Sequence, residues 1–204
     1  MENSDLKERT KKLLQKNGNI KGETINFILQ YLQKKEGDDA LEKLKERLSQ
    51  LELPFDVTRV KNFSLIKDSI VAIVMLAIKD VFQWTDDDIF EMGKAEPKNS
   101  FIVRLLMKYL VSIEKTFERA PDFWRKFYDF GYLETIEFSD SEKYFKLGVY
   151  EYDTDPVMCK YLAGFIHTMV AFSMKEKSVS IEETKCIYKG DSYHEYTVSW
   201  KNNN

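Results

Sequence analysis

Cysteine and histidine are scarce in this sequence, which has two of each among 204 residues. Two cysteines are too few for the disulfide framework of a small secreted domain. Because no apolar leader segment follows Met1, we expect a cytoplasmic protein whose thiols are free or bound to a metal ion. Thiolate and imidazole ligands are confined to four positions near the C-terminus: Cys159, His167, Cys186 and His194.

The sequence also lacks a long uncharged hydrophobic run and an excess of charge of either sign. Its most apolar stretch, residues 65–81, is interrupted by charged pairs that leave only about ten uncharged residues between them, too few to cross a bilayer. The 31 basic and 34 acidic residues nearly cancel, to a formal charge of −3. No net field therefore attracts nucleic acid or an anionic membrane, and we expect neither nucleic-acid binding nor membrane insertion.

Glycine and proline are rare as well, at eight and four residues, whereas aromatic residues make up 14% of the chain. So few breakers of helices and strands argue against long disordered segments. A chain of 204 residues suits a single domain with one large core. Within it we expect an N-terminal helical subdomain, residues 1–54, and an α/β subdomain, residues 55–204. The many aromatic side chains can fill a core or line an apolar pocket.

The first half of the chain has the periodicity of amphipathic helices, with apolar residues three and four apart. It predicts helices over residues 5–17, 23–35 and 38–53. An irregular connector over residues 54–63 should follow. Ser64 then caps a helix that is apolar around most of its circumference, as a central helix must be.

The next helices are predicted from their caps. Thr85 and the three aspartates after it form a capping box, with the acids at the positive end of the helix dipole. We expect that helix to end near Gly93. A long helix should then run over residues 100–117, and Pro121 should start a shorter aromatic helix that ends at Gly131.

The periodicity changes to two at Tyr132. Residues 132–138 and 144–152 should form a hairpin, and residues 156–175 should form an amphipathic helix that begins with Asp155 as its cap. A second hairpin should join residues 179–188 to residues 193–200 through a turn at residues 189–192. The sequence thus predicts an α+β fold, in which an N-terminal helical bundle packs with a four-stranded, mainly antiparallel sheet.

This order of elements and the last 50 or so residues resemble a known superfamily. The residues that carry the resemblance are Cys159 with Leu162-Ala163-Gly164-Phe165, Glu182-Glu183-Thr184-Lys185-Cys186, and Lys189-Gly190-Asp191-Ser192-Tyr193-His194-Glu195-Tyr196. The superfamily joins haem nitric-oxide-binding (H-NOX) domains, vinyl-reductase-type small-molecule-binding domains and TRAPP vesicle-tethering subunits. The chain is most similar to the vinyl-reductase-type and non-canonical haem-NO-binding-like branches. The resemblance implies a small-molecule cleft between the helices and the sheet.

The sequence departs from the haem-binding pattern of that superfamily. H-NOX domains hold haem by a histidine on a helix before the sheet and grip its propionates with a Tyr-x-Ser-x-Arg motif. Here no histidine precedes His167, and Tyr109, Tyr128 and Tyr132 are not followed by that motif. We therefore do not expect haem bound by the usual ligation of the family.

A metal site is one interpretation of the C-terminal cysteines and histidines. Cys159 and His167 are two helical turns apart, about 12 Å, too far to share one ion. The family pattern suggests Cys159, Cys186 and His194 instead, a set suited to zinc or iron. A three-residue hairpin loop would place Cys186 and His194 on one side of the sheet. A four-residue loop, which the apolar pattern favours, would turn Cys186 away and leave both cysteines as small buried hydrophobic residues.

We expect a small-molecule binding or sensing module without catalytic activity. No nucleophile has a histidine and an acid arranged with it, no glycine-rich loop could hold phosphates, and Glu182 and Glu183 point to opposite faces of a strand. The ligand should be apolar, in a pocket lined by Phe101, Leu105, Tyr109, Phe127, Cys159, His167 and Trp200.

Two alternatives to this function stay open from the sequence. A protein-interaction module like the TRAPP branch would dimerise through the leucine-striped helices before Pro54. A haem gas sensor would need non-standard ligation. Neither the ligand, nor a homodimer, nor a signalling partner follows from the sequence alone.

Overall fold

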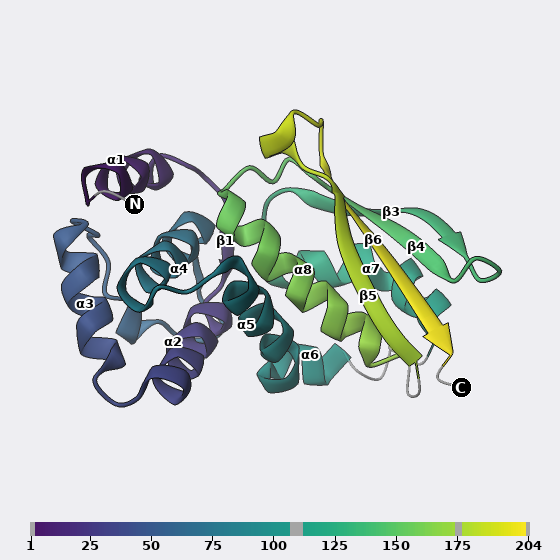
Figure 1. Cartoon of the computed structure of the whole chain (residues 1–204), viewed down its shortest axis with the longest axis horizontal. Coiled ribbons are helices and arrows are strands. Elements are labelled where there is room, and N and C mark those ends of the chain that lie inside the picture. Colours follow the sequence, from purple (N-terminus) through teal and green to yellow (C-terminus); the bar gives the residue numbers. More distant parts are fainter. Residues whose placement is uncertain (1–2, 107–111, 174–176, 203–204) are drawn as a thin grey trace.

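The computed structural model of the chain describes residues 3–106, 112–173 and 177–202 (Figure 1). The helices are α1 Asn3–Leu14, α2 Glu23–Glu36, α3 Ala40–Gln50, α4 Asp68–Phe82, α5 Asp86–Asn99, α6 Phe101–Leu106, α7 Ile113–Phe127 and α8 Pro156–Ala171. The strands are β1 Asn19–Lys21, β2 Leu65–Lys67, β3 Tyr132–Ser139, β4 Tyr144–Tyr150, β5 Lys177–Lys185 and β6 His194–Asn202. None of the described helices combines the length and hydrophobicity needed to cross a bilayer.

Helix α4 is the centre of the helical part of the molecule. Its residues are buried without interruption from Asp68 to Ile78, and α1, α2 and α3 all contact it. The prediction of a central helix is confirmed. It begins at Asp68 rather than after Ser64, because residues 65–67 form β2 and pair antiparallel with β1. Strands of three residues are too short to show a periodicity in the sequence.

The capping box at Thr85 is confirmed, since its hydroxyl accepts the backbone N–H of Asp88 and the Asp88 carboxylate accepts that of Thr85. The expected end near Gly93 is wrong. Helix α5 continues past Pro97 to Asn99, although a proline inside a helix removes one helical hydrogen bond.

The single long helix expected over residues 100–117 is also wrong. Helix α6 is described only to Leu106, residues 107–111 lie outside the described part, and α7 begins after Ser112, whose hydroxyl accepts the backbone N–H of Lys115. Helix α7 then passes through Pro121 to Phe127, so Pro121 does not start a helix of its own.

The four-stranded sheet has the order β3-β4-β6-β5, and each neighbouring pair is antiparallel. Helix α8 starts at Asp155, which accepts the backbone N–H of Val157 as an N-cap. Figure 1 shows α8 lying along one side of the sheet, between it and α5. The α+β fold with its hairpin, helix and hairpin is confirmed. The division into subdomains at residue 54 stays a prediction.

Helices α5 and α8 cross with their backbones in contact. A Cβ atom on Gly93 would lie 2.1 Å from the carbonyl oxygen of Tyr161, and one on Gly164 would lie 2.1 Å from that of Phe90. Only glycine permits so close an approach. This contact fixes α8 against α5 on one side while its other side faces the sheet.

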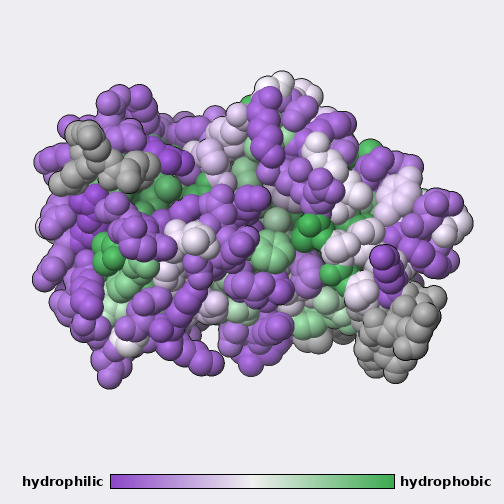
Figure 2. Space-filling view, viewed as in Figure 1, coloured by the Kyte–Doolittle hydropathy of each residue, from purple (hydrophilic) through white to green (hydrophobic). Residues whose placement is uncertain are grey.

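Figure 2 shows that hydrophilic residues cover most of one face of the molecule, with hydrophobic residues in small separate groups. The large apolar side chains that are exposed include Phe63, Leu65, Phe101 and Leu105. Phe63 and Phe101 contact each other, with ring centroids 5.9 Å apart, and some exposed apolar residues are normal on a protein surface.

Candidate functional site

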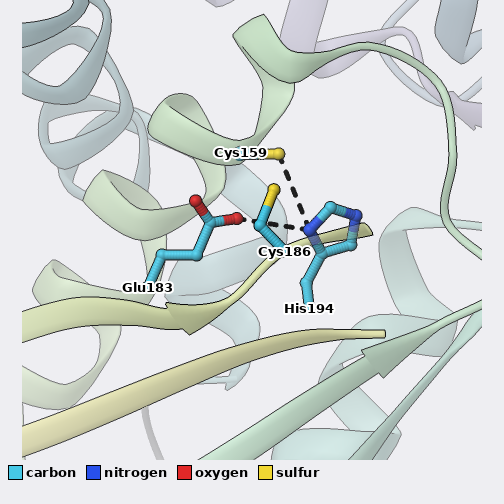
Figure 3. Close-up of side chains that lie close together, drawn as sticks. All are labelled: Cys159, Glu183, Cys186 and His194. Atoms are coloured by element: carbon cyan, nitrogen blue, oxygen red, sulfur yellow. Dashed lines mark hydrogen bonds and ion pairs between the residues drawn. The ribbon is translucent and has the colours of Figure 1, made fainter. Parts of the chain in front are cut away.

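Four side chains from α8 and the C-terminal hairpin converge on one point (Figure 3). They are Cys159 on α8, Glu183 near the end of β5, Cys186 just after β5, and His194 at the start of β6. One ligand atom of each lies within 4.8 Å of the ligand atoms of the other three. Both cysteines and the histidine are buried, and Glu183 is half-buried. Such a set of thiols, imidazole and carboxylate has the composition of a metal centre.

The shape of the hairpin loop brings Cys186 to this point. The register of β5 on β6 shifts between Glu183 and Lys185, and the loop after Cys186 is a 3-10 turn over residues 187–189 rather than a tight turn. The Asp191 carboxylate accepts the backbone N–H of Cys186 at 2.8 Å. The expectation that Cys186 points away from His194 is therefore wrong. A β-bulge changes the face to which the following residues point.

The hydrogen bonds of His194 decide which nitrogen faces the cluster. Its Nε2 lies 2.9 Å from the carbonyl oxygen of Tyr152, which can only accept, so Nε2 carries the hydrogen. In the neutral ring Nδ1 then has a free lone pair, and it lies 3.2 Å from Oε1 of Glu183 and 3.7 Å from Sγ of Cys159. The Cys159 thiol can donate its hydrogen to this lone pair when no ion is bound, and the close approach of the Glu183 carboxylate to Nδ1 becomes favourable when a cation lies between them or the ring is protonated. A backbone carbonyl behind the second ring nitrogen is the usual support of a metal-bound histidine.

The two distances from His194 Nδ1, to Cys159 Sγ and to Glu183 Oε1, match the edges of a zinc tetrahedron. With Zn–S near 2.3 Å and Zn–N or Zn–O near 2.1 Å, ligand atoms lie about 3.6 Å apart for S–N and about 3.4 Å for N–O. The distance from Cys159 Sγ to His194 Nδ1 is 3.7 Å, and that from His194 Nδ1 to Glu183 Oε1 is 3.2 Å. These two distances fit zinc ligation, and the remaining ligand atoms lie within 4.8 Å of one another.

Burial and charge keep the two thiols protonated as long as no cation neutralises them. Burial raises the pKa of Cys159 well above its ordinary range, and the negative charge of Glu183 adds to the rise. The pKa of Cys186 is also raised by burial, again with a contribution from Glu183. A bound divalent cation reverses this preference because it stabilises thiolates directly.

A separate apolar cavity of about 70 Å³ lies between α7, α8 and the sheet. Aromatic side chains supply much of its wall: Phe117, Phe123, Trp124, Phe127, Tyr128, Phe145, Tyr161 and Phe165. Aliphatic side chains such as Leu133, Leu147 and Ile166 complete it, with Met169 as the only sulfur among the described lining residues. The position and the apolar wall are those of a ligand pocket.

One end of this cavity is polar. Glu96 of α5 lines it and is only 1% exposed. The Thr24 hydroxyl donates to Oε1 of Glu96 at 2.8 Å, and the Tyr161 hydroxyl donates to Oε2 at 2.6 Å. Burial raises the pKa of Glu96 to about 7, while the two hydroxyls act against the rise and Glu23 adds to it.

The structure separates the seven residues that we expected to line one pocket. Phe127 lines the cavity, and Cys159 belongs to the metal cluster. Phe101 and Leu105 are 43% and 56% exposed and do not line the cavity, because α6 turns Ile102, Val103 and Leu106 inward instead.

The other three expected residues also lie away from the cavity or outside the described part. The Nε2 atom of His167 lies 3.1 Å from the carbonyl oxygen of Val179 on β5. Trp200 is buried and packs against Phe145, but it is not among the residues lining the cavity. Tyr109 lies outside the described residues.

No protein-family model and no curated protein matches this sequence. Solved structures do match the fold. An H-NOX protein from S. oneidensis in the Fe(II)NO ligation state has 10% sequence identity and a TM-score of 0.67, over 89% of this chain and 99% of that one. A variant of the K. algicida H-NOX protein in the unliganded Fe(II) state has 13% identity and a TM-score of 0.65, over 90% and 97% of the two chains. The chain has the H-NOX fold.

A further matching structure was solved to probe haem distortion in the H-NOX family. It is 14% identical, with a TM-score of 0.62 over 90% of this chain and 95% of that one. Haem is therefore the group that this fold implies. The described residues do not fit haem. Those that line the cavity include no histidine, cysteine, lysine or arginine to bind its iron or its propionates. Of the chain's two histidines, His194 faces the cysteine cluster and His167 faces a strand backbone. A cavity of about 150 Å³ holds benzene, so the 70 Å³ here is far too small for a porphyrin.

Two acids of these sites were not predicted from the sequence. Glu183 was interpreted as one of a pair on opposite strand faces, which is correct, but its partners depend on the β-bulge beside it. The sequence does indicate the burial of Glu96, because this residue is four positions after Met92 and seven after Ile89, on the buried face of α5. A carboxylate on such an apolar stripe indicates a buried polar contact.

Proposed function

We propose that this protein is a small-molecule binding or sensing module without catalytic activity, whose small, largely apolar ligand occupies the cavity that Phe127 lines. The observation that carries the proposal is a cavity of about 70 Å³ with aromatic walls in the interior of an H-NOX fold. Packed interiors contain few voids larger than a water molecule, and apolar ones stay dry and accept small apolar guests.

Xenon tests the cavity without knowledge of its ligand. Methyl NMR signals of Leu133, Leu147 and Ile166, which line the cavity, should shift under xenon pressure. Ala120→Phe fills the cavity and should abolish the shifts, whereas Lys126→Leu, at an exposed position of the same helix, should keep them. If xenon leaves the wild-type signals unchanged, the protein has no accessible cavity and the proposal fails.

A haem gas sensor with non-standard ligation is tested by adding haem to the purified protein. The absence of imidazole and thiolate from the described lining residues predicts no saturable Soret band. A stoichiometric haem complex would overturn the assignment of the cavity to a smaller ligand.

A second proposed role is metal binding by Cys159, Glu183, Cys186 and His194, and we assign the ion to zinc. Two thiolates with an imidazole and a carboxylate, spaced as a tetrahedron, suit zinc better than harder divalent ions. The ion would join α8 to the loop of the C-terminal hairpin. It would be a structural or redox-sensitive element of the module rather than a catalyst, because all four positions are filled by protein atoms.

Elemental analysis of protein purified without a histidine tag tests this role. We expect one zinc per chain in the wild type and in His167→Asn, the matched control at the other histidine. Cys186→Ser should lose zinc. Absence of stoichiometric zinc from the wild type, together with full stability of Cys186→Ala, would exclude a metal centre.

The leucine stripes expected to form the contact surface of a TRAPP-like interaction module face the core of this chain. The leucines of the first three helices, among them Leu6, Leu13, Leu44 and Leu48, are buried in the core of the protein itself. Dimerisation through another surface is a separate question, which light scattering on the full chain answers.

A further inference from the structure

Three side chains at the polar end of the cavity, Glu96, Thr24 and Tyr161, present hydrogen-bond acceptors to it when Glu96 is ionised. The hydroxyls of Thr24 and Tyr161 each have one hydrogen, and each donates it to Glu96. What these hydroxyls present to the cavity is therefore oxygen lone pairs. Each carboxylate oxygen of Glu96 also retains acceptor capacity beyond the one bond it receives. A ligand that enters here must bring hydrogen-bond donors of its own.

Above a pH of about 7, where Glu96 is ionised, the same end carries negative charge without a matching cation among the described lining residues. The described residues that line the cavity include no lysine, arginine or histidine. A second acid, Glu23, is close enough to raise the pKa of Glu96 further, although burial is the larger cause. Glu23 is only 6% exposed, and its Oε2 has no hydrogen-bond partner among the described residues. An ionised carboxylate in an apolar interior is costly unless it is paired.

The rest of the cavity favours a cation with a short apolar body. Rings of Phe, Tyr and Trp line it, and aromatic faces attract ammonium groups. The volume of about 70 Å³ corresponds to roughly two molecules of liquid water. Only a ligand of a few heavy atoms therefore fits without movement of the flexible Met169 side chain.

We propose that the cavity binds a small organic amine in its protonated form, with the ammonium group donating to Glu96, Thr24 and Tyr161 and a short alkyl body against the aromatic wall. An ammonium group has three donors, which matches three acceptor groups. A hydroxyl group would bring one donor and no charge. This inference rests on the proposed function and names the class of ligand for the same cavity.

The test compares n-propylamine with n-propanol, which has the same number of heavy atoms. Both are titrated into the full chain at pH 8, where the amine is protonated and Glu96 is ionised, and the methyl signals of Leu133 and Leu147 are followed by NMR. We expect the amine to bind at least tenfold more tightly than the alcohol. Glu96→Gln should weaken amine binding at least tenfold, and Glu91→Gln, which removes an exposed charge from the same helix, should leave it unchanged.

Thr24→Val supplies a second variant in case Glu96→Gln unfolds, and it should weaken the amine by severalfold through the loss of one acceptor. Equal affinities for amine and alcohol, full amine affinity in folded Glu96→Gln, or absence of amine binding would each overturn the inference. The xenon experiment distinguishes failure of the amine inference from failure of the proposed function. Xenon shifts without amine binding overturn the amine alone, whereas the absence of both overturns the cavity as a binding site.

Discussion

Cys159 and His194 are 35 residues apart in the chain, yet Sγ of the cysteine lies 3.7 Å from Nδ1 of the histidine. The cysteine is held by α8, and the histidine is held by a strand and by its contact with the carbonyl of Tyr152. An ion at this point would therefore add a second connection between α8 and β6, which are already joined by a hydrogen bond from the Tyr196 hydroxyl to the Cys159 carbonyl.

Chelation should loosen this connection. Because a metal ion binds the folded state and not the unfolded chain, its removal should lower the melting temperature on the order of 10 °C. In partly denaturing urea, both thiols should react with iodoacetamide faster after chelation than before it, because burial keeps them protonated and inaccessible in the folded chain. Circular dichroism and mass spectrometry provide the two measurements, and returning zinc should reverse both. Identical melting and alkylation with and without chelator would contradict the metal centre.

The free energy of unfolding should depend on pH because of the proton that Glu96 binds. Burial raises the pKa of Glu96 to about 7 from its ordinary value of 4.5. The folded state therefore holds this proton more tightly than the unfolded state, and stability is lost as pH rises from about 4.5 to about 7. The groups that face Glu96 are Glu23 and Thr24 from α2 and Tyr161 from α8, none of which is a cation.

Urea denaturation of the wild type and Glu96→Gln at a series of pH values measures this effect. The unfolding free energy of the wild type relative to the variant should fall by roughly 3 kcal/mol across that window. Glu91→Gln serves as the control on an exposed acid of the same helix. A difference that stays flat between pH 4.5 and 7 would show that Glu96 is not buried as described.

Local signals in the sequence predicted the parts of the fold that depend on neighbouring residues. The caps at Thr85 and Asp155 each lie where the sequence places them, because a cap is made within one turn of a helix. The passage of α7 through Pro121 was missed, because tertiary packing outweighed the local preference of proline for a first turn. The strands β1 and β2 were missed because their pairing partners lie far away in sequence.

The candidate sites were predictable to different degrees. Resemblance to a known pattern selected Cys159, Cys186 and His194, but the register of a regular hairpin argued against their convergence. A bulge next to Glu183 brings the three side chains together, and no residue in that strand indicates a bulge in the sequence. The cavity could not be placed because it is formed by α5, α7, α8 and the sheet together.

Because α5 and α8 cross with their backbones in contact, a single added methyl group at the crossing should destabilise the protein. In Gly164→Ala the new Cβ would lie 2.1 Å from the backbone carbonyl of Phe90, so the two helices must separate. We expect a loss of about 1–3 kcal/mol in the free energy of unfolding, although alanine favours a helix by about 1 kcal/mol over glycine. Lys160→Ala at an exposed position of α8 should change stability by no more than about 0.5 kcal/mol. Equal stability of the two variants would contradict the backbone contact.

The start of α8 depends on a carboxylate with two separate roles. Asp155 is 4% exposed, accepts the backbone N–H of Val157 at 2.9 Å, and receives two hydrogen bonds from the Arg9 guanidinium at 2.8 and 2.6 Å. Asp155→Asn retains a capping oxygen but loses the charge, whereas Asp155→Ala loses both and leaves the Arg9 guanidinium without this carboxylate. Loss of the cap costs about 1 kcal/mol, and a charge-assisted hydrogen bond contributes about 1.5–3 kcal/mol. Alanine should therefore destabilise the protein more than asparagine does, as measured by urea denaturation. Lys12→Ala, which breaks an exposed ion pair with Glu8, should have almost no effect on stability.

Because Cys159 lies in the first turns of α8, Asp155→Ala should also weaken zinc retention, which elemental analysis of the purified variant measures. Stability of the alanine variant equal to that of the wild type would show that α8 is fixed by packing alone.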